Sequence, residues 1–232
     1  MRKFWSYITN GVYSVGCTGR MVYVYDQAGA EVAKFKDIRH GYHAALSPTQ
    51  NLLVVKSTEA CFAVYSLDQL SLIRIVEFSD VNLSQDDGYC FSKDGSRFYN
   101  IERQGSSTNS AISVYDTATF ERTQMFLEDD GKMEPSYIEC AENGEIFVLG
   151  YLRGDNGVIC GGFVSRLSEQ GLEEIRKISV EDYDYYHDFK ALELKGFTET
   201  AKEFSGFAYK NVDMTGMEQR KLPLAELWEK AV

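Results

Sequence analysis

Residues 88–127, GYCFSKDGSRFYNIERQGSSTNSAISVYDTATFERTQMFL, contain the pattern that decides the fold. A short apolar segment leads into the polar turn Ser92-Lys93-Asp94-Gly95, and two further apolar segments follow, the second ending in Val114-Tyr115-Asp116. A fourth segment, Phe120–Phe126, is more polar and alternates. Gly and Asp tolerate the positive φ angles that tight hairpins require. The stretch therefore predicts four short antiparallel strands joined by turns.

The same order of segments recurs along the chain. The other copies are Val12–Ile38, which lacks its first segment, His43–Phe78 and Ser136–Val180. Equivalent positions lie 40 residues apart from Asp26 to Ser66 and 50 residues apart from Ser66 to Asp116. Repeats of this length with four strands each are typical of β-propeller blades. Short strands at this spacing also occur in β-sandwiches, but the repeated order of motifs favours a propeller.

The sequence resembles the WD-repeat and YVTN-type β-propeller families over about residues 12–180. The resemblance rests on Leu46-Ser47-Pro48, on Phe91-Ser92-Lys93-Asp94-Gly95, and on the Val-Tyr-Asp and Val-Tyr-Ser tripeptides that end the third segments. These match the FSPDG turn and the V-W-D strand end of those families, with Tyr in place of Trp. The resemblance implies an all-β fold of four-stranded antiparallel blades, and it is weak for function.

The length of 232 residues allows about five blades in a single propeller domain. We expect repeat copies at residues 1–38, 39–80, 81–130 and 131–181, with an irregular part at 182–220. The first copy lacks its inner strand unless Lys3–Thr9 supplies it.

The C-terminal part is less regular. Tyr185–Leu194 and Ser205–Met214 are each expected to form an inner strand. A short helix at 223–231 places Leu224, Leu227 and Trp228 on one face, which we expect to cap the body of the protein.

Charge and composition limit the partners and the compartment. The net charge of −11 disfavours nucleic acid and anionic membranes, because both bind mainly through Lys and Arg. The chain has neither a signal-peptide pattern nor an apolar run of the roughly 20 residues that span a bilayer. Its five cysteines form no CxxC pair, which predicts free thiols in a reducing cytosol. We therefore expect a cytoplasmic, acidic protein.

The loops that enter the innermost strands of a propeller lie at one mouth of its central channel, where ligands commonly bind. Aligning the repeats predicts a ligand-binding or partner-binding set at this mouth, with no metal ligands among them: His40, Tyr42, Asp86, Asp87, Glu134, Asp184, Tyr185, Tyr186, His187 and Asp188. Within this set, residues 181–188 alternate acidic and aromatic side chains. Such a stretch suits a basic protein partner, because Tyr buries a large contact area at low entropic cost.

Motifs for catalysis are absent from the sequence: it contains no GxSxG, P-loop, GxGxxG or HExxH pattern. We therefore expect no cofactor and favour a non-catalytic binding or scaffold propeller that engages a protein partner. One alternative is a small-ligand binder, or a hydrolase or lyase, that uses His187 and a carboxylate at the channel mouth. Another is a partial propeller that completes itself by forming oligomers, and the oligomeric state is left open.

Overall fold

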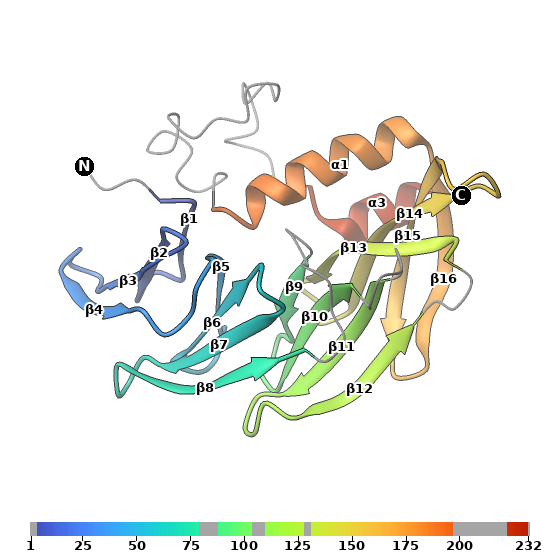
Figure 1. The fold of residues 1–232 in the computed structure, drawn as a ribbon. Helices are drawn as coiled ribbons and strands as arrows, with labels where there is room; N and C mark the ends of the chain where they lie inside the picture. Colours follow the sequence, from blue (N-terminus) through green and yellow to red (C-terminus); the bar gives the residue numbers. More distant parts are fainter. Residues whose placement is uncertain (1–3, 79–87, 104–109, 128–130, 197–221, 232) are drawn as a thin grey trace. The chain divides into compact units, whose positions relative to one another are not determined.

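The strands within the described residues form four four-stranded antiparallel sheets (Figure 1). A computed structural model describes residues 4–78, 88–103, 110–127, 131–196 and 222–231. The chain divides into two compact units, which are described separately. The described part of the first unit is 4–78 and 191–196, and that of the second is 88–103, 110–127, 131–190 and 222–231.

The first unit contains two of the sheets, each from one repeat copy. The first sheet has the order β1 (Ser6–Thr9), β2 (Ser14–Cys17), β3 (Val22–Tyr25) and β4 (Glu31–Phe35). The second has the order β5 (Gly41–Leu46), β6 (Leu52–Ser57), β7 (Cys61–Ser66) and β8 (Ser71–Glu77). Strand β1, which lies within Lys3–Thr9, supplies the segment that the first repeat copy otherwise lacks.

The second unit contains the other two sheets. One has the order β9 (Tyr89–Phe91), β10 (Arg97–Arg103), β11 (Ser110–Asp116) and β12 (Arg122–Leu127). The other has the order β13 (Met133–Cys140), β14 (Ile146–Arg153), β15 (Ile159–Ser168) and β16 (Gly171–Ile178).

Each unit has an apolar core between its two sheets. In the first unit, Val15 and Val24 pack with Leu53, Val55 and other buried side chains of the second sheet. In the second unit, Ile101 and Ile112 of one sheet form a core with Val148 and Phe163 of the other. Apolar side chains recur at every second position of these strands, and a sheet buries such a face by packing it on another sheet.

The fourth strand of each sheet is the most exposed. Strand β7 has a buried centre, whereas most of β8 beside it is exposed. The same contrast separates β15 from β16. The polarity of the fourth segment in each repeat therefore corresponds to its place at the outer edge of the sheet.

One predicted strand is wrong. Residues Val180–Glu193 form helix α1, which replaces both the loop expected at 181–188 and the inner strand expected at Tyr185–Leu194. The reason is local: the capping residue Ser179 precedes the segment, and the buried side chains of Tyr183, Tyr186 and Phe189 recur every third residue. Ser205–Met214 lies outside the described residues.

The C-terminal helix α3 (Leu224–Lys230) buries Leu224, Leu227 and Trp228, the three side chains predicted to share a face. Trp228 donates from Nε1 to the carbonyl of Glu174 at 3.0 Å and lies between the guanidinium groups of Arg166 and Arg176. Helices α1 and α3 are both too short or too polar to be membrane-spanning segments, and the part of the chain that the structure describes offers no other candidate.

Candidate functional site

Helix α1 begins at a capping box. The Ser179 hydroxyl accepts from the backbone N–H of Asp182 at 3.0 Å and donates to the Asp182 carboxylate at 2.8 Å. Glu181 and Asp182 occupy the first turn, where the helix dipole favours negative charge, and Lys190 occupies the last turn. The pattern Ser-x-x-Asp therefore starts a helix directly after the last strand of the repeat.

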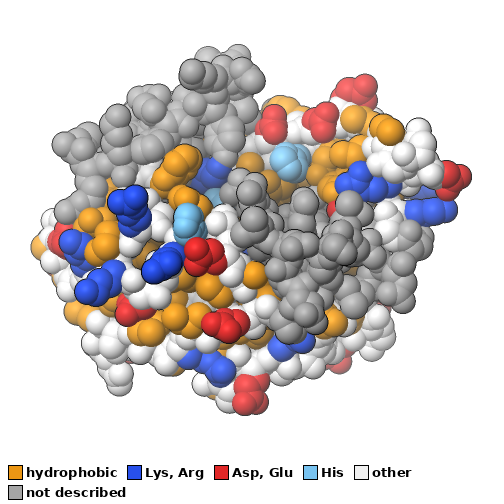
Figure 2. Space-filling view, viewed as in Figure 1, with side chains coloured by type: hydrophobic (Ala, Val, Ile, Leu, Met, Phe, Trp, Pro, Cys, Tyr) orange, Lys and Arg blue, Asp and Glu red, His pale blue; other side chains and the backbone are white. Residues whose placement is uncertain are grey.

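The acidic and aromatic residues of 181–188 separate onto two sides of α1. On one side Tyr183, Tyr186 and Phe189 are buried at a spacing of three residues. The other side carries residues spaced by three and four positions, all of them exposed: Glu181, Asp184, Tyr185 and Asp188. We call these four residues the acidic face. Figure 2 shows acidic side chains in red over α1.

The buried side of α1 is attached to β13 and β15. Tyr183 shares a hydrogen bond of 3.0 Å with the Ser136 hydroxyl. Its Cβ lies so close to Gly162 that a Cβ at residue 162 would stand 2.6 Å from it. Lys190, which is buried, pairs with the carboxylate of Glu139. These contacts hold α1, and with it the acidic face, in one position on the sheet.

Glu134 lies beneath this region in a buried polar network. Its carboxylate accepts from the Tyr151 hydroxyl and from Nε of Arg153, the latter at 2.6 Å. Burial and the bond to Glu134 raise the pKa of Tyr151, and the same carboxylate raises the pKa of Arg153. Nη1 of Arg153 also donates to the carbonyl of Gly157 at 2.8 Å, which fixes the guanidinium. Both carboxylate oxygens of Glu134 are therefore engaged within the protein.

His187 is half-exposed at the edge of this network. Its ring packs edge-on against Tyr137, with centroids 5.2 Å apart, and lies 5.5 Å from the ring of Tyr183. Tyr183 in turn contacts the ring of Tyr151, the partner of Glu134. The second unit thus brings together the predicted residues Glu134 and His187 through two tyrosines.

The remaining predicted site residues lie in the first unit, outside the described residues, or at buried positions. His40 and Tyr42 lie in the first unit at the start of β5, with Nδ1 of His40 3.3 Å from the Tyr42 hydroxyl. Asp86 and Asp87 lie outside the described residues. Glu134 and Tyr186 were expected on exposed loops, and both are buried, at 1% and 8% exposure. Glu134 is buried because it lies within β13, and Tyr186 because it is on the inner side of a helix.

Several contributing residues were missed from the sequence, although signals for them exist. The Asn143-Gly144 turn sets the pairing of β13 with β14 as far as Tyr137, and a register shift between Pro135 and Tyr137 then places Tyr151 opposite Glu134. The capping box at Ser179 and the three-residue spacing from Tyr183 to Phe189 both indicate a helix. No sequence signal links Lys190 to Glu139, because that contact depends on where α1 lies on the sheet.

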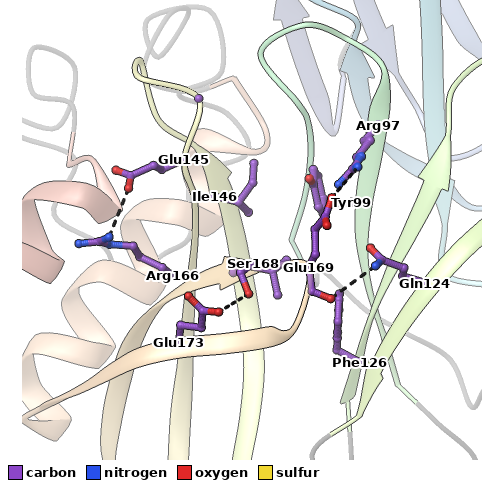
Figure 3. Close-up of a pocket in the computed structure, with 12 residues that line it drawn as sticks. Arg97, Tyr99, Gln124, Phe126, Glu145, Ile146, Arg166, Ser168, Glu169 and Glu173 are labelled. Atoms are coloured by element: carbon purple, nitrogen blue, oxygen red, sulfur yellow. Dashed lines mark hydrogen bonds and ion pairs between the residues drawn. The ribbon is translucent and has the colours of Figure 1, made fainter.

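A cleft of about 290 Å³ lies at the opposite ends of β13 and β14 from Glu134 (Figure 3). Its walls come from the β13–β14 turn, the β15–β16 turn, and strands β10 and β12. Arg97 pairs with Glu169 at 3.2 Å, and this bond raises the pKa of Arg97. Arg166 pairs with Glu145 at 3.4 Å. Because its arginines are already paired with acids, the cleft offers an anion no uncompensated positive charge.

No group of three or more His, Cys, Asp or Glu side chains suited to a metal ion occurs among the residues that the structure describes.

Comparison with solved structures places the fold. The chain matches hydrazine synthase of Kuenenia stuttgartiensis with a TM-score of 0.58 and 18% identity, over 73% of this chain and 47% of that one. It matches the WD40 domain of Toxoplasma gondii coronin with a TM-score of 0.52 and 13% identity, over 75% of this chain and 44% of that one. The chain has a WD40-like β-propeller fold.

At these identities the likeness is one of fold alone. The chain spans less than half the length of either matched structure. No family model and no curated protein matches the sequence.

Proposed function

We propose that this protein is a non-catalytic binding module that engages a basic protein partner through the acidic face of α1. The observation that carries the proposal is the position of Tyr185, which is 47% exposed among the carboxylates of Glu181, Asp184 and Asp188. An exposed tyrosine within a ring of charge is a common arrangement for a binding anchor. WD40-like folds are compatible with such a role, although the fold by itself assigns none.

The attachment of α1 supports this proposal. The contacts of Tyr183 with Ser136 and Gly162, and of Lys190 with Glu139, fix the helix before any partner arrives. A preorganised surface loses little conformational entropy on binding, so more of the contact energy becomes affinity.

The charge of the acidic face supports the class of partner that we propose. Three carboxylates on one helical side attract Lys and Arg side chains and repel phosphate backbones and anionic lipid. We therefore propose a basic protein as the partner, rather than nucleic acid or membrane. The five free cysteines support the cytoplasmic location that we propose.

The number of blades is also a proposal. The described residues form four sheets, and about five blades remain our proposal for the complete ring.

A ligand-binding or hydrolase-type role for the channel mouth is the second candidate, and His187 is the observation that favours it. The ring of His187 is half-exposed beside Tyr137 and Tyr183, within reach of a ligand. Glu134 is a poor acid or base for such a reaction, because its carboxylate is already bound to Tyr151 and Arg153. Because the Glu134 carboxylate is bound in this way, we favour the binding module over an enzyme.

The test compares wild-type protein with Tyr185→Ala and with an Asp184→Asn, Asp188→Asn double variant, each immobilised and exposed to native extract at low and high salt. We expect a set of basic proteins that the wild type retains and both variants lose, with binding that weakens as salt rises. One such protein, purified, is then titrated against each variant. Loss of the Tyr185 ring is expected to lower affinity by about 2 kcal/mol, or roughly thirtyfold.

Ile175→Ala is the matched control, because Ile175 is an exposed apolar residue of the same unit at 44% exposure. His187→Gln separates the two candidate functions, since it should leave partner binding unchanged. If Tyr185→Ala retains every partner at wild-type affinity, the acidic face is not the binding surface.

A further inference from the structure

Strand β8 is the outermost strand of its sheet in the first unit (teal in Figure 1). Its inner edge pairs with β7, and no strand among the described residues pairs with its outer edge. An unpaired strand edge presents backbone N–H and C=O groups that a further strand can bind.

The side chains of β8 are unusual for an exposed edge. Of the large apolar residues exposed in the described part of the chain, four fall within six consecutive positions in and next to this strand: Leu70, Leu72, Ile73 and Ile75. Ile73 is 50% exposed and Ile75 is 40% exposed. We call residues 70–77 the β8 edge.

The outer strands β4 and β16 of two other sheets are protected by charge, whereas β12 carries Arg122 as its only charged residue. Strand β16 carries Glu173, Glu174, Arg176 and Lys177 within Gly171–Ile178. Strand β4 carries Glu31 and Lys34 within its five residues. Charged side chains are the usual means by which proteins keep edges from pairing. Strand β8 has only Arg74 and the terminal Glu77, so it carries less charge than β16, and its pairing with β7 shifts register at Ile73.

The backbone of β8 directs hydrogen-bonding groups outward. The N–H of Phe78 donates to the carbonyl of Ala60 at 2.9 Å, so Phe78 bonds toward β7. Residues alternate between inward and outward hydrogen bonding along an antiparallel edge. Ile75 and Glu77 therefore present their N–H and C=O groups away from the sheet.

We infer that the β8 edge pairs in antiparallel fashion with the β8 edge of a second copy of this chain. Two identical antiparallel edges supply each other with equal numbers of donors and acceptors, and an isologous pair closes after two copies. Arg74 and Glu77 leave the strand without net charge in a chain of net charge −11. Two copies therefore meet little charge repulsion where these strands approach each other. The pairing joins the two copies through one continuous sheet and buries Ile73 and Ile75.

The experiment measures mass by sedimentation velocity and light scattering over a wide range of protein concentration. We expect the wild type to pass from monomer to dimer as concentration rises. Ile73→Lys and Ile75→Lys should each weaken dimerisation at least tenfold, because each removes apolar contact surface and places on the edge a charged side chain of the kind that keeps strand edges from pairing. Ile175→Lys is the matched control: it adds the same charge at an isoleucine of similar exposure on β16, and it should dimerise as the wild type does.

Amide hydrogen exchange gives the second measurement. In the dimer, exchange across residues 71–77 should slow at high concentration, while exchange across β16 stays constant. If Ile75→Lys fails to fold, Ile75→Thr keeps the β-branched shape, removes apolar surface and should weaken the dimer in the same direction. The inference is overturned by a wild type that stays monomeric at every concentration. It is also overturned by a dimer that the β8 variants leave intact, or by one that Ile175→Lys weakens equally.

Discussion

The carboxylate of Glu134 and the guanidinium of Arg153 form an ion pair of 2.6 Å in which the acid is almost fully buried and the base is 25% exposed. Tyr151 donates to the same carboxylate, so the acid keeps one neutral partner if the arginine is removed. The pair joins two adjacent strands, β13 and β14, close to the strands that hold α1. Variants of this buried pair and of an exposed ion pair show how much each contributes to the free energy of unfolding.

Arg153→Met is expected to lower the free energy of unfolding by about 2 kcal/mol, because a buried carboxylate loses a charged hydrogen-bond donor. Adding Glu134→Gln should restore part of this loss, since the amide carries no charge to leave uncompensated. Chemical denaturation of both single variants and the double variant gives the coupling energy. The exposed pair of Lys132 and Asp155, at 3.2 Å, provides the control: Asp155→Asn should change stability by less than about 1 kcal/mol.

Ser179→Ala is expected to destabilise the protein by about 1 kcal/mol, because it removes both hydrogen bonds of the capping box. The loss should be local at first, so amide exchange in the first turns of α1 should increase more than exchange in β13. Ser179→Thr, which keeps the hydroxyl, should behave like the wild type. Uniform exchange changes across the second unit would contradict a local capping role.

The sheets of this protein were predictable from the sequence because the apolar segments and turns within each repeat indicate the order of its four strands. The turn after Phe91, the Val114-Tyr115-Asp116 strand end and the polar fourth segment each depend on neighbours within about forty residues. Local patterns of this kind survive changes in tertiary packing. The same is true of α3, whose three buried residues lie on one face at helical spacing.

Helix α1 was missed because two periodicities coexist in residues 181–188. Acidic and aromatic residues alternate, which favours a strand, and tyrosine has high β propensity. Tyr183, Tyr186 and Phe189 recur at three-residue spacing, which favours a helix, and Ser179 supplies the cap. The helical pattern also separates the stretch into a buried side and an exposed side, so Tyr185 and Tyr186 cannot share one role.

The candidate site was only partly predictable for a different reason. Glu134 and His187 were both identified, but the tyrosines that connect them come from β14 and α1. Their contact depends on how helix α1 packs on the sheet, and this packing could not be derived from the amino-acid sequence. The same holds for the ion pairs of the cleft, where Arg97 and Glu169 are far apart in the chain.

The five cysteines should differ in reactivity according to burial. Cys160 is exposed, whereas burial raises the pKa of Cys17 to about 12 and raises that of Cys90 well above its usual range. Thiolate is the reactive form, so a thiol reagent at mild alkaline pH should modify Cys160 first and leave Cys17 unmodified until the protein unfolds. Mass spectrometry of reagent-treated peptides measures the order. Cys160→Ser should remove the fast phase, and modification of Cys17 in the folded protein would contradict its burial.

Asp94 should make the β9–β10 turn sensitive to acid. Its carboxylate accepts from the Ser92 hydroxyl at 2.6 Å and from the backbone N–H and hydroxyl of Ser96, and these bonds, that of Ser92 foremost, lower its pKa to about 2. A carboxyl whose pKa is lower in the folded state stabilises the fold above its ordinary pKa and loses that contribution as pH falls toward the lowered value. The contribution should therefore be complete near neutral pH and disappear between about pH 4 and pH 2. Asp94→Asn should lower the midpoint of chemical denaturation at pH 7 and match the wild type near pH 2, whereas Asp155→Asn should show no such convergence. NMR titration of the Asp94 carboxyl gives the pKa directly, and a value at or above that of an ordinary aspartate would show that the turn does not depend on its charge.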